Sequence, residues 1–404
     1  MIVQDTLNLL YEGSVKRVLS CPGNDASLWF EFTDDYSVFD WGKMPDTIEN
    51  KGNAMAVMGA FFFDQLQRQE FWQTLPTNKH LQKFDAQWLK ERFQHPVFRN
   101  LQAHGAPTHF EGLLQGKDKI SDFTSFCLGK EPLLMEVERA QIVRPKPYVL
   151  HGNQLYFYEC SVLPEKRLIP LEIVFRFGLP AGSSLTQRLE RDPQYIKTLG
   201  LKKKPEPDQM FEHPVIEFFT KLEPKDRLLS LQEATLMAKL DLVPFENMTE
   251  LAFDTALALF VIFAERKIEL WDGKLEMILA HGKLKLADSI GPDELRLIYK
   301  NCHLSKEMIR QVYRGSAWET ALKDAQLKAA TDPSRSWKDI CVDELHCSPD
   351  KLSAPVKEVV DQLYGVLANH LTDTHIFPDH PELEDFVQTM PSHLVPAGLP
   401  AKQT

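Results

Sequence analysis

A pair of acidic side chains on two neighbouring predicted strands is the first candidate for chemistry in this sequence. In residues 270–278 polar and apolar positions alternate, so Glu276 lies on the polar face of a strand. His281-Gly282 then indicates a turn, and the next strand ends at Asp288. With a three-residue loop, Glu276 lies opposite Asp288, with Cβ atoms about 4.5–5.5 Å apart. Two carboxylates at that separation repel each other unless a cation or a proton intervenes.

This acidic pair predicts a divalent-metal site. Mg²⁺ is favoured because proteins commonly hold it with one or two carboxylates together with nucleotide phosphates. The alternative is an ordinary hairpin, since a two-residue loop at His281-Gly282 would turn Asp288 to the other face and Asp272-Gly273 is itself a turn signal. Strand geometry leaves both interpretations open. Asp272 and Lys274 share the polar face of Glu276 in either case.

Two further segments have residue types that could bind phosphate. Near the N-terminus, Gly13-Ser14 separates two predicted strands and Lys16 follows, so backbone N–H groups and an ammonium could meet a phosphate. A plain hairpin turn explains the same residues. Later in the chain, Pro292 and the acids after it predict a helix start, whose free N–H groups and Arg296 could bind a phosphate. An exposed Arg on a surface helix is the alternative there.

Charged residues in an apolar strand and in loops add further candidates. Glu172 and Arg176 interrupt an apolar strand on one face, and buried charges need partners or ligands. A loop of small residues around Ser183 follows and would allow close approach of a ligand. Asp40 lies in a polar turn before Lys51-Gly52, for which a solvated loop is the alternative.

The composition is that of an ordinary folded protein. With 404 residues, 43% hydrophobic and 25% charged, the chain fits neither a fibrous nor a disordered class and predicts two or three lobes. A net charge of −11 argues against non-specific nucleic-acid binding. The six cysteines have no metal-binding spacing, so reduced thiols are expected. The most apolar stretch, 255–264, is far shorter than the ~20 residues of a membrane span, and no export signal is visible, so a cytoplasmic location is expected.

Strands are expected to dominate early in the chain and helices late. This order favours an α+β fold with a β-rich N-terminal lobe and a larger second lobe. The predicted elements are a meander over 7–40, helices over 52–101, strands over 107–176 with a hairpin tip at His151-Gly152-Asn153, a helix over 247–266 with a capping box at Asn247 and Glu250, strands over 267–279 and 284–288, and helices from 292 to about 330 and around 356–367.

Taken together, these segments resemble the family of phosphoribosylaminoimidazole-succinocarboxamide synthases, also called SAICAR synthetases. The resemblance covers about residues 9–315, with gaps, and consists of nine segments in the same order. They are LLYEGSVKRVL at 9–19, DDYSVFD at 34–40, KG at 51–52, GAPTHFEGLL at 105–114, IPLEIVFR at 169–176, AGSSL at 181–185, PVIEFFTK at 214–221, LWDGKLEMI at 270–278 and LADSIGPDELRL at 286–297.

The resemblance implies a two-lobed α+β ligase that binds ATP and Mg²⁺ between an N-terminal antiparallel β-rich lobe and a larger α+β lobe. Its expected reaction joins L-aspartate to carboxyaminoimidazole ribotide through an acyl phosphate, in purine biosynthesis. Its expected partners are these small-molecule substrates and a possible second copy in a homo-oligomer, with no nucleic acid and no membrane. The expected parts are a nucleotide-binding lobe at 1–168, a substrate and metal lobe at 169–330 and a helical extension at 331–404.

The resemblance also implies roles for individual residues. The expected catalytic residues are Lys221, Lys274 and Asp288. The nucleotide is expected to meet Gly13, Ser14, Lys16, Glu276 and Asp288, and the metal to be held by Glu276 and Asp288. The expected substrate-binding residues are Arg176, Ser183, Asp226 and Arg296, with Arg296 on the ribotide phosphate. Asp40, Glu172 and Asp272 match further polar positions of the pocket.

The chain departs from the family pattern in several places. Ser289 stands where the family usually has an acid after Asp288, and Ile278 stands where it usually has Gly. One extra residue lies between Arg176 and Gly182, and segments near 65–100 and after 331 are additional. Two alternatives therefore stay open, namely an ATP-binding pseudoenzyme on the same scaffold and an amide ligase for a different acid or amine.

Overall fold

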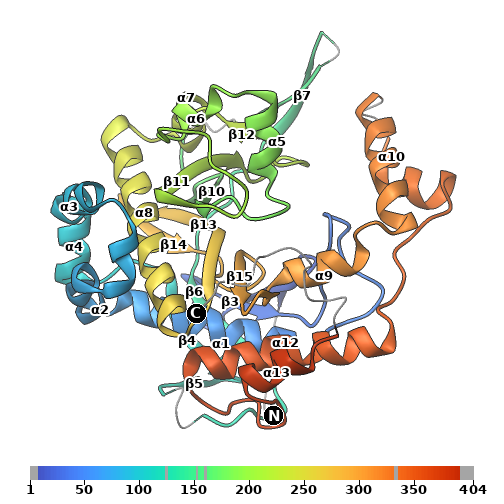
Figure 1. The fold of residues 1–404 in the computed structure, drawn as a ribbon, viewed down its shortest axis with the longest axis horizontal. Coiled ribbons are helices and arrows are strands. Elements are labelled where there is room, and N and C mark those ends of the chain that lie inside the picture. Colours follow the sequence, from blue (N-terminus) through green and yellow to red (C-terminus); the bar gives the residue numbers. More distant parts are fainter. Residues whose placement is uncertain (1–7, 123–125, 152, 159–161, 332–334, 392–404) are drawn as a thin grey trace.

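The chain folds into two antiparallel sheets and the helices that cover them (Figure 1). The computed structural model describes residues 8–122, 126–151, 153–158, 162–331 and 335–391. One sheet has six strands and the other eight, and a separate two-stranded hairpin stands apart from both. This combination of helices with antiparallel sheets confirms the α+β class expected from the sequence.

The first sheet is built mainly from N-terminal residues and supports a buried helix. Its strands are β1 (Leu9–Glu12), β2 (Lys16–Ser20), β3 (Ser27–Phe32), β4 (Phe110–Gln115), β5 (Asp118–Ile120) and β6 (Leu133–Glu138). The order across the sheet is β1-β2-β3-β6-β4-β5. Met135 and Val137 of β6 are buried in the core that contains helix α1 (Lys51–Gln67). The meander expected over 7–40 is confirmed by β1 to β3.

The first turn of α1 lies very close to the end of β3. A Cβ on Gly52 would lie 2.2 Å from the carbonyl oxygen of Phe32, so only glycine fits at this position. The backbone N–H of Gly52 donates a 2.9 Å hydrogen bond to Asp34 Oδ1, which satisfies one free group of the helix start. Lys51 is 1% exposed. The Lys51-Gly52 pair is therefore the buried start of a helix and not a solvated loop.

The helical stretch expected over 52–101 is confirmed. It comprises α1, α2 (Gln69–Thr74), the 3₁₀ helices η1 (Leu75–Thr77) and η2 (Lys79–Lys83), α3 (Ala86–Gln94) and α4 (Pro96–His104). Pro96 at the first position of α4 fits a helix start, because its missing N–H would be unpaired there in any case.

The second sheet carries one apolar face and one charged face. Its strands are β9 (Lys166–Leu168), β10 (Leu171–Gly178), β11 (Met210–Thr220), β12 (Leu228–Leu229), β13 (Glu269–Ala280), β14 (Lys283–Ala287), β15 (Leu295–Tyr299) and β16 (Cys302–His303). The main order is β12-β11-β10-β13-β15-β16, and β9 and β14 both pair with β13. Ile173, Phe175 and Leu275 are buried in the same core as helix α8 (Leu242–Glu265).

Helix α8 is the central core helix of this lobe. Among the described residues it is the one helix whose length and composition would also suit a membrane span. However, 72% of its apolar window is buried inside the protein, which is typical of a core helix.

Two sequence-based helix predictions are wrong in part or in full. The stretch expected to be helical from Pro292 to about residue 330 begins instead with a turn and β15, because Leu295 and Leu297 alternate with Arg296 and fit the pleat beside β13. The rest of that stretch is confirmed by α9 (Lys306–Tyr313) and α10 (Ala317–Thr331). The capping box at Asn247 and Glu250 is also wrong, because α8 begins earlier, at Leu242. Glu250 forms an ion pair with Arg92 of α3 instead.

The remaining elements complete both lobes. They are α5 (Ser184–Arg191), α6 (Tyr195–Thr198), α7 (Leu231–Ala238), α9 (Lys306–Tyr313), α10 (Ala317–Thr331), α11 (Trp337–Asp339), the π-helical turn η3 (Ile340–Glu344), α12 (Ala354–Thr372) and α13 (Leu383–Thr389). Helix α12, the amphipathic helix expected around 356–367, packs along α1, as Figure 1 shows. The C-terminal residues therefore share the main core with the first lobe.

Two sequence predictions concern the hairpin and the cysteines. The hairpin consists of β7 (Lys146–Leu150) and β8 (Asn153–Phe157), which confirms the predicted pairing, although Gly152 at its tip lies outside the described residues. The five cysteines within the described residues are all free thiols, as expected, and Cys160 lies outside them.

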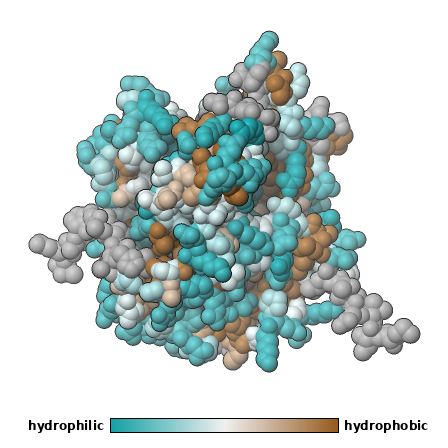
Figure 2. All heavy atoms as spheres, turned by 90° about the vertical axis from the view of Figure 1, so that its right-hand side faces the viewer, coloured by the Kyte–Doolittle hydropathy of each residue, from teal (hydrophilic) through white to brown (hydrophobic). Residues whose placement is uncertain are grey.

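Figure 2 shows that the face turned toward the viewer is mostly hydrophilic, which fits the acidic composition.

Asp254 is a buried carboxyl within core helix α8. It is fully buried, and neither of its oxygens has a hydrogen-bond partner among the described residues. Burial raises its pKa well above the usual value, although the nearby Arg92 opposes this effect. Burial therefore favours the neutral, protonated form of Asp254 in the folded protein, whereas the carboxyl is ionised in the unfolded chain at neutral pH. Stability associated with this group is fully present below pH ~4 and is lost as the pH rises toward the raised folded-state pKa.

Asp254→Asn should therefore become progressively more favourable as the pH rises. Relative to the native chain, we expect the free energy of unfolding of the variant to increase between pH 4 and pH 8, because the native carboxyl is driven to ionise over this range and the amide is not. Urea unfolding at both pH values measures this difference. Asp324→Asn, at an exposed position on α10, is the control and should show no such gain. An equal effect of Asp254→Asn at the two pH values would contradict a neutral carboxyl.

Candidate active site

The charged side chains of the second sheet lie on its face opposite α8. The β10–β13 register places Arg176 beside Asp272 and Val174 beside Lys274. The β13–β15 register places Asp272 beside Arg296. Because alternate residues of a strand share a face, four adjacent strands together present one charged surface. It is formed by Glu217 of β11, Glu172 and Arg176 of β10, Asp272, Lys274 and Glu276 of β13, and Arg296 of β15.

Three lysine–carboxylate pairs lie at one end of this surface. Lys221, which follows β11, pairs with Glu276. Lys274 Nζ donates a 2.7 Å hydrogen bond to Glu172 Oε1.

The third pair joins the two sheets. Lys16 of β2 pairs with Asp288, which follows β14. Lys16 is the last residue of a tight turn that contains Ser14. In this turn the N–H of Gly13 donates a 2.8 Å hydrogen bond to the carbonyl oxygen of Lys16. Lys16, a predicted nucleotide residue of the first sheet, therefore contacts Asp288, a predicted metal residue beside the second.

The route by which Asp288 reaches this cluster differs from the predicted one. The β13–β14 loop has two residues, His281 and Gly282, with φ of 50° and 73°. Glu276 consequently lies opposite Ala287, so the predicted direct pairing of Glu276 with Asp288 is wrong. The strand ends at Ala287, and Asp288 takes a left-handed φ of 67°. Because of this backbone turn, the side chain of Asp288 no longer follows the alternation of the strand, and it pairs with Lys16.

The electrostatics show that Glu276 and Asp288 share one site. Burial, and then the negative charge of Asp288, raise the pKa of Glu276 above its usual value. Burial alone would also raise the pKa of Asp288, but the ammonium groups of Lys16 and Lys221 outweigh it and hold that pKa well below its usual value. Burial alone would lower the pKa values of Lys221 and Lys274, but the surrounding carboxylates raise both, so both lysines are charged.

A buried histidine fixes the backbone at Asp288. Burial lowers the pKa of His109 to about 4, so its ring is neutral at neutral pH. His109 Nε2 lies 3.2 Å from the carbonyl oxygen of Asp288, and a carbonyl can only accept, so Nε2 carries the proton and donates it. The backbone N–H of His109 also donates a 2.8 Å hydrogen bond to Leu286 O. His109 therefore positions Asp288, and the sequence analysis did not identify it.

The residues present fit a magnesium ion. Glu276 and Asp288 offer hard oxygen donors close enough for the charge of Asp288 to raise the pKa of Glu276, and a divalent cation would relieve this repulsion. No group of three or more His, Cys, Asp or Glu suited to a metal occurs among the described residues. Mg²⁺ does not require such a group, since phosphates and water supply its other ligands.

A second network of alternating charges crosses the sheet at the other end of the surface. Arg176 is 5% exposed, and its Nε and Nη1 donate hydrogen bonds of 2.5 Å to Glu217 and 3.0 Å to Asp272. Arg188 of α5 and the hydroxyl of Tyr195 each donate 2.8 Å hydrogen bonds to Glu217. Both ends of the Arg176 guanidinium are therefore held by carboxylates of the chain.

The loop predicted to approach the ribotide lies beside Arg296. Ser183 is buried at the N-cap of α5, where its Oγ accepts a 3.3 Å hydrogen bond from Leu185 N. Arg296 Nη1 donates a 3.3 Å hydrogen bond to Ala181 O, and its Nε lies 3.5 Å from Asp272 Oδ1. Arg296 thus comes from a strand, not from the predicted helix, yet it reaches the predicted loop.

Asp226 and Asp40 also lie near the lysine cluster. Burial, and then the negative charge of Glu172, raise the pKa of Asp226 to about 6. Asp40 and Lys221 act on the same carboxyl. The structure therefore brings these predicted polar residues to the same end of the charged surface.

Comparison with known proteins identifies the family. The family model described as SAICAR synthetase matches residues 9–325. The chain belongs to the SAICAR synthetase family. A relative from Archaeoglobus fulgidus, provisionally named phosphoribosylaminoimidazole-succinocarboxamide synthase, is 31% identical over 384 residues, which cover 94% of this chain and 98% of the relative. A synthase of the same name from Thermoplasma volcanium is 25% identical over 336 residues, which cover 81% and 90%.

The fold and the role agree with this family. A solved SAICAR synthase structure aligns with a TM-score of 0.50 and 15% identity, covering 92% of this chain and 97% of that chain, which shows a shared fold. The chain is accordingly an ATP-dependent ligase of purine biosynthesis, as the resemblance implied.

Two departures from the family pattern are packed into the structure. Ile278 is 3% exposed and packs in a small apolar cluster with Ala280 and Ala287. Ser289 is 5% exposed and forms a hydrogen bond with Glu294. Burial, and then Asp293, raise the pKa of Glu294 to about 8. Ile278 thus has a packing role, and Ser289 is the hydrogen-bond partner of an acid five residues later.

Sequence reasoning missed Glu217, His109 and Glu294. The signal for Glu217 was available, because it interrupts the apolar run of β11 as Glu172 interrupts that of β10. His109 and Glu294 gave no such signal, because their partners lie in distant or irregular segments.

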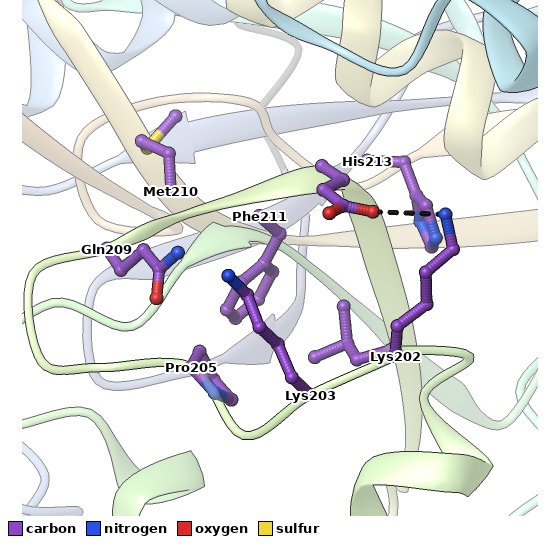
Figure 3. A pocket seen from close by; sticks show the side chains of 9 residues that line it. Lys202, Lys203, Pro205, Gln209, Met210, Phe211 and His213 are labelled. Atoms are coloured by element: carbon purple, nitrogen blue, oxygen red, sulfur yellow. Dashed lines mark ion pairs between the residues drawn. The ribbon is translucent and has the colours of Figure 1, made fainter.

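A small pocket elsewhere in the second lobe is separate from this site. It has an empty volume of about 370 Å³ and is lined by the loop before β11 and the first residues of that strand (Figure 3). Lys202 and Glu212, which both line the pocket, form an ion pair. None of the predicted site residues lines it.

Proposed function

We propose that the charged face of the second sheet, closed by β2 of the first sheet, is where ATP, the ribotide and L-aspartate react. The observation that carries this proposal is the contact of Lys16 with Asp288 beside the pair of Lys221 with Glu276. Together these pairs combine cations for a triphosphate with carboxylates for its metal ion. A cluster of opposite charges between two lobes is what phosphoryl transfer requires, since its catalysis is mostly positioning and charge stabilisation.

The proposed reaction has two steps. A carboxylate oxygen of carboxyaminoimidazole ribotide attacks the γ-phosphorus of ATP, and ADP leaves. The amine of aspartate then attacks the acyl carbon, loses a proton and expels phosphate, which forms the amide. When bound, Mg²⁺ would neutralise charge on the phosphates. Glu276 and Asp288 would hold this ion.

The lysines hold the phosphates in this proposal. Lys16 and Lys221 each pair with a carboxylate that suits a metal ion. When Mg-ATP binds, its phosphates would replace these carboxylates as partners of the two lysines, and the carboxylates would hold Mg²⁺ in place of the lysines. Lys274 stays charged beside Glu172 and adds positive potential to the same region. The phosphates therefore meet a preorganised set of cations.

The ribotide lies toward the other end of the charged surface in this proposal. Arg296 reaches the loop that contains Ser183, so the two could bind the ribotide phosphate together. Asp226 and Asp40 lie at the lysine end, near the reacting carboxylate. A cytoplasmic location, self-association into a homo-oligomer and the three-part division of the chain remain predictions from the sequence.

An omission assay tests this proposal. Purified protein is mixed with ATP, Mg²⁺, the ribotide and aspartate, and each component is omitted in turn while ADP and the amide product are measured. We expect product only in the complete mixture and at least a hundredfold loss with EDTA, the order of magnitude of a lost electrostatic contact in an active site. Nucleotide binding without product would support the pseudoenzyme alternative. ADP release with another acid or amine would support the other ligase.

A further inference from the structure

A buried ion pair joins the start of α1 to the turn between β14 and β15. Lys51 Nζ lies 2.9 Å from Asp293 Oδ2, and the two side chains are 1% and 7% exposed. Burial alone would raise the pKa of Asp293, but Lys51 and Lys306 outweigh it and lower that pKa to about 2. Asp293 is therefore an ionised group inside the protein, and each of its oxygens needs a partner.

The partner of the other oxygen comes from helix α12, late in the chain. The hydroxyl of Tyr364 on α12 donates a 2.6 Å hydrogen bond to Asp293 Oδ1. Tyr364 is 0% exposed, and Lys51 Nζ lies 5.3 Å from the centre of its ring. Helix α12 begins at Ala354, beyond residue 325, where the family match ends. A residue outside the matched segment thus completes a buried charge network of the first and second lobes.

The turn that holds Asp293 is attached directly to the candidate active site. The N–H of Lys274 donates a 3.1 Å hydrogen bond to Glu294 O, and the N–H of Lys306 donates a 3.3 Å hydrogen bond to Pro292 O. The same turn connects Asp288 on one side to Arg296 on the other. Any shift of Asp293 is therefore transmitted through five residues or fewer to a proposed metal ligand and a proposed phosphate ligand.

We infer that Tyr364 is a positioning residue of the ligase site, which acts by holding Asp293 and thereby the turn between Asp288 and Arg296. This inference rests on the proposed function of that site. Helix α12 is then a part of the active-site scaffold and not only a cover for α1. Removal of the hydroxyl leaves the ring and its packing in place, so a loss of activity reports on the hydrogen bond to Asp293 alone.

Tyr364→Phe should impair the reaction while the protein remains folded. We expect kcat/KM for the ribotide to fall at least tenfold. Tyr299→Phe is the matched control, because Tyr299 on β15 also donates a hydrogen bond, of 2.7 Å, to an acid of a C-terminal helix, Glu384 of α13. We expect Tyr299→Phe to stay within twofold of the native chain. Equal kinetics of the two variants would overturn the inference.

A double-mutant comparison separates positioning from general destabilisation. If Tyr364 acts through Asp293, Tyr364→Phe combined with Asp293→Asn should be no slower than Asp293→Asn alone. Independent, additive losses in kcat/KM would contradict a pathway through Asp293. Circular dichroism confirms that each variant is folded.

Hydrogen exchange distinguishes a failure of this inference from a failure of the proposed function. In the native chain and the two tyrosine variants, exchange of the backbone amides of 286–297 is followed by mass spectrometry without any substrate. We expect at least tenfold faster exchange in Tyr364→Phe and none of this acceleration in Tyr299→Phe. A native protein without ligase activity but with this local acceleration would refute the proposed reaction and retain the positioning role. Unchanged exchange in 286–297 would refute the positioning role.

Discussion

Replacing Asp288 with Ala should reduce kcat by roughly two to three orders of magnitude while the protein stays folded, the range measured for loss of a strong electrostatic contact in an active site. The carboxylate of Asp288 is the partner of Lys16 and shares its site with Glu276. Its loss removes one of the two proposed oxygen ligands of Mg²⁺. ADP formation measures the turnover, and calorimetry should show that ADP binding no longer strengthens when Mg²⁺ is added.

The control for this variant must account for the backbone at Asp288. Its φ of 67° is left-handed, where Ala is about 1–2 kcal/mol less favourable than in the right-handed region. Asp373→Ala matches this backbone penalty, because Asp373 has a φ of 55° at the exposed C-terminal end of α12. Asp288→Asn complements it, because Asn tolerates the left-handed conformation but carries no charge. Near-normal activity of Asp288→Ala would show that the metal assignment is wrong.

The polar face of β13 could be predicted from the sequence because it depends only on alternation within one strand. Asp272, Lys274 and Glu276 lie two residues apart, and this spacing alone places them on one face. The family resemblance added Lys16 and Lys221 to the same site. The contact of Lys16 with Asp288 joins residues 272 positions apart, and no local pattern predicts such a pairing.

The turn before β15 shows why the start of a strand was mistaken for a helix. Pro292 followed by two acids is typical of a first helical turn, but proline is also favoured in tight turns. Leu295 and Leu297 then alternate with Arg296, and the hydrogen bonds to β13 favour a strand. Tertiary pairing decided between two local interpretations.

The β13–β14 hairpin shows a different kind of error. Both His281 and Gly282 have positive φ, which is the two-residue turn that best matches the twist of paired strands. This loop would place Asp288 on the wrong face if the strand continued. The strand stops at Ala287, and the left-handed backbone of Asp288 brings its carboxylate back to the site. A sequence pattern cannot show where a strand ends to within one residue.

Arg176 is where the resemblance and the contacts point to different roles. The resemblance implies that Arg176 grips the ribotide, whereas the structure gives both sides of its guanidinium to Glu217 and Asp272. Within the part of the chain that the structure describes, Arg296 has in contrast only a 3.5 Å contact with Asp272 and one hydrogen bond to a backbone carbonyl. The two arginines should therefore respond differently to substitution.

Arg176→Met should lower the free energy of unfolding by about 3–5 kcal/mol, the cost of removing one partner of a buried ion pair. Arg296→Met should cost less stability, because it leaves Asp272 paired with Arg176, and should mainly raise KM for the ribotide. Urea unfolding measures stability, and initial rates at varied ribotide concentration measure KM. If Arg176→Met does not fold, the less disruptive Arg176→Lys provides the comparison, because it keeps the charge but loses the two-sided contact.

A second substitution tests whether the loss in Arg176→Met is electrostatic. In Arg176→Met the carboxylate of Glu217 keeps Arg188 and Tyr195, whereas Asp272 keeps, among the residues that the structure describes, only Arg296. Most of the unpaired charge should then belong to Asp272, so adding Asp272→Asn should recover part of the lost stability, whereas Glu217→Gln should recover less. If neither Asp272→Asn nor Glu217→Gln recovers stability, an unpaired carboxylate charge is not the cause of the loss in Arg176→Met. The loss would then come from the missing packing contacts of the arginine side-chain stem.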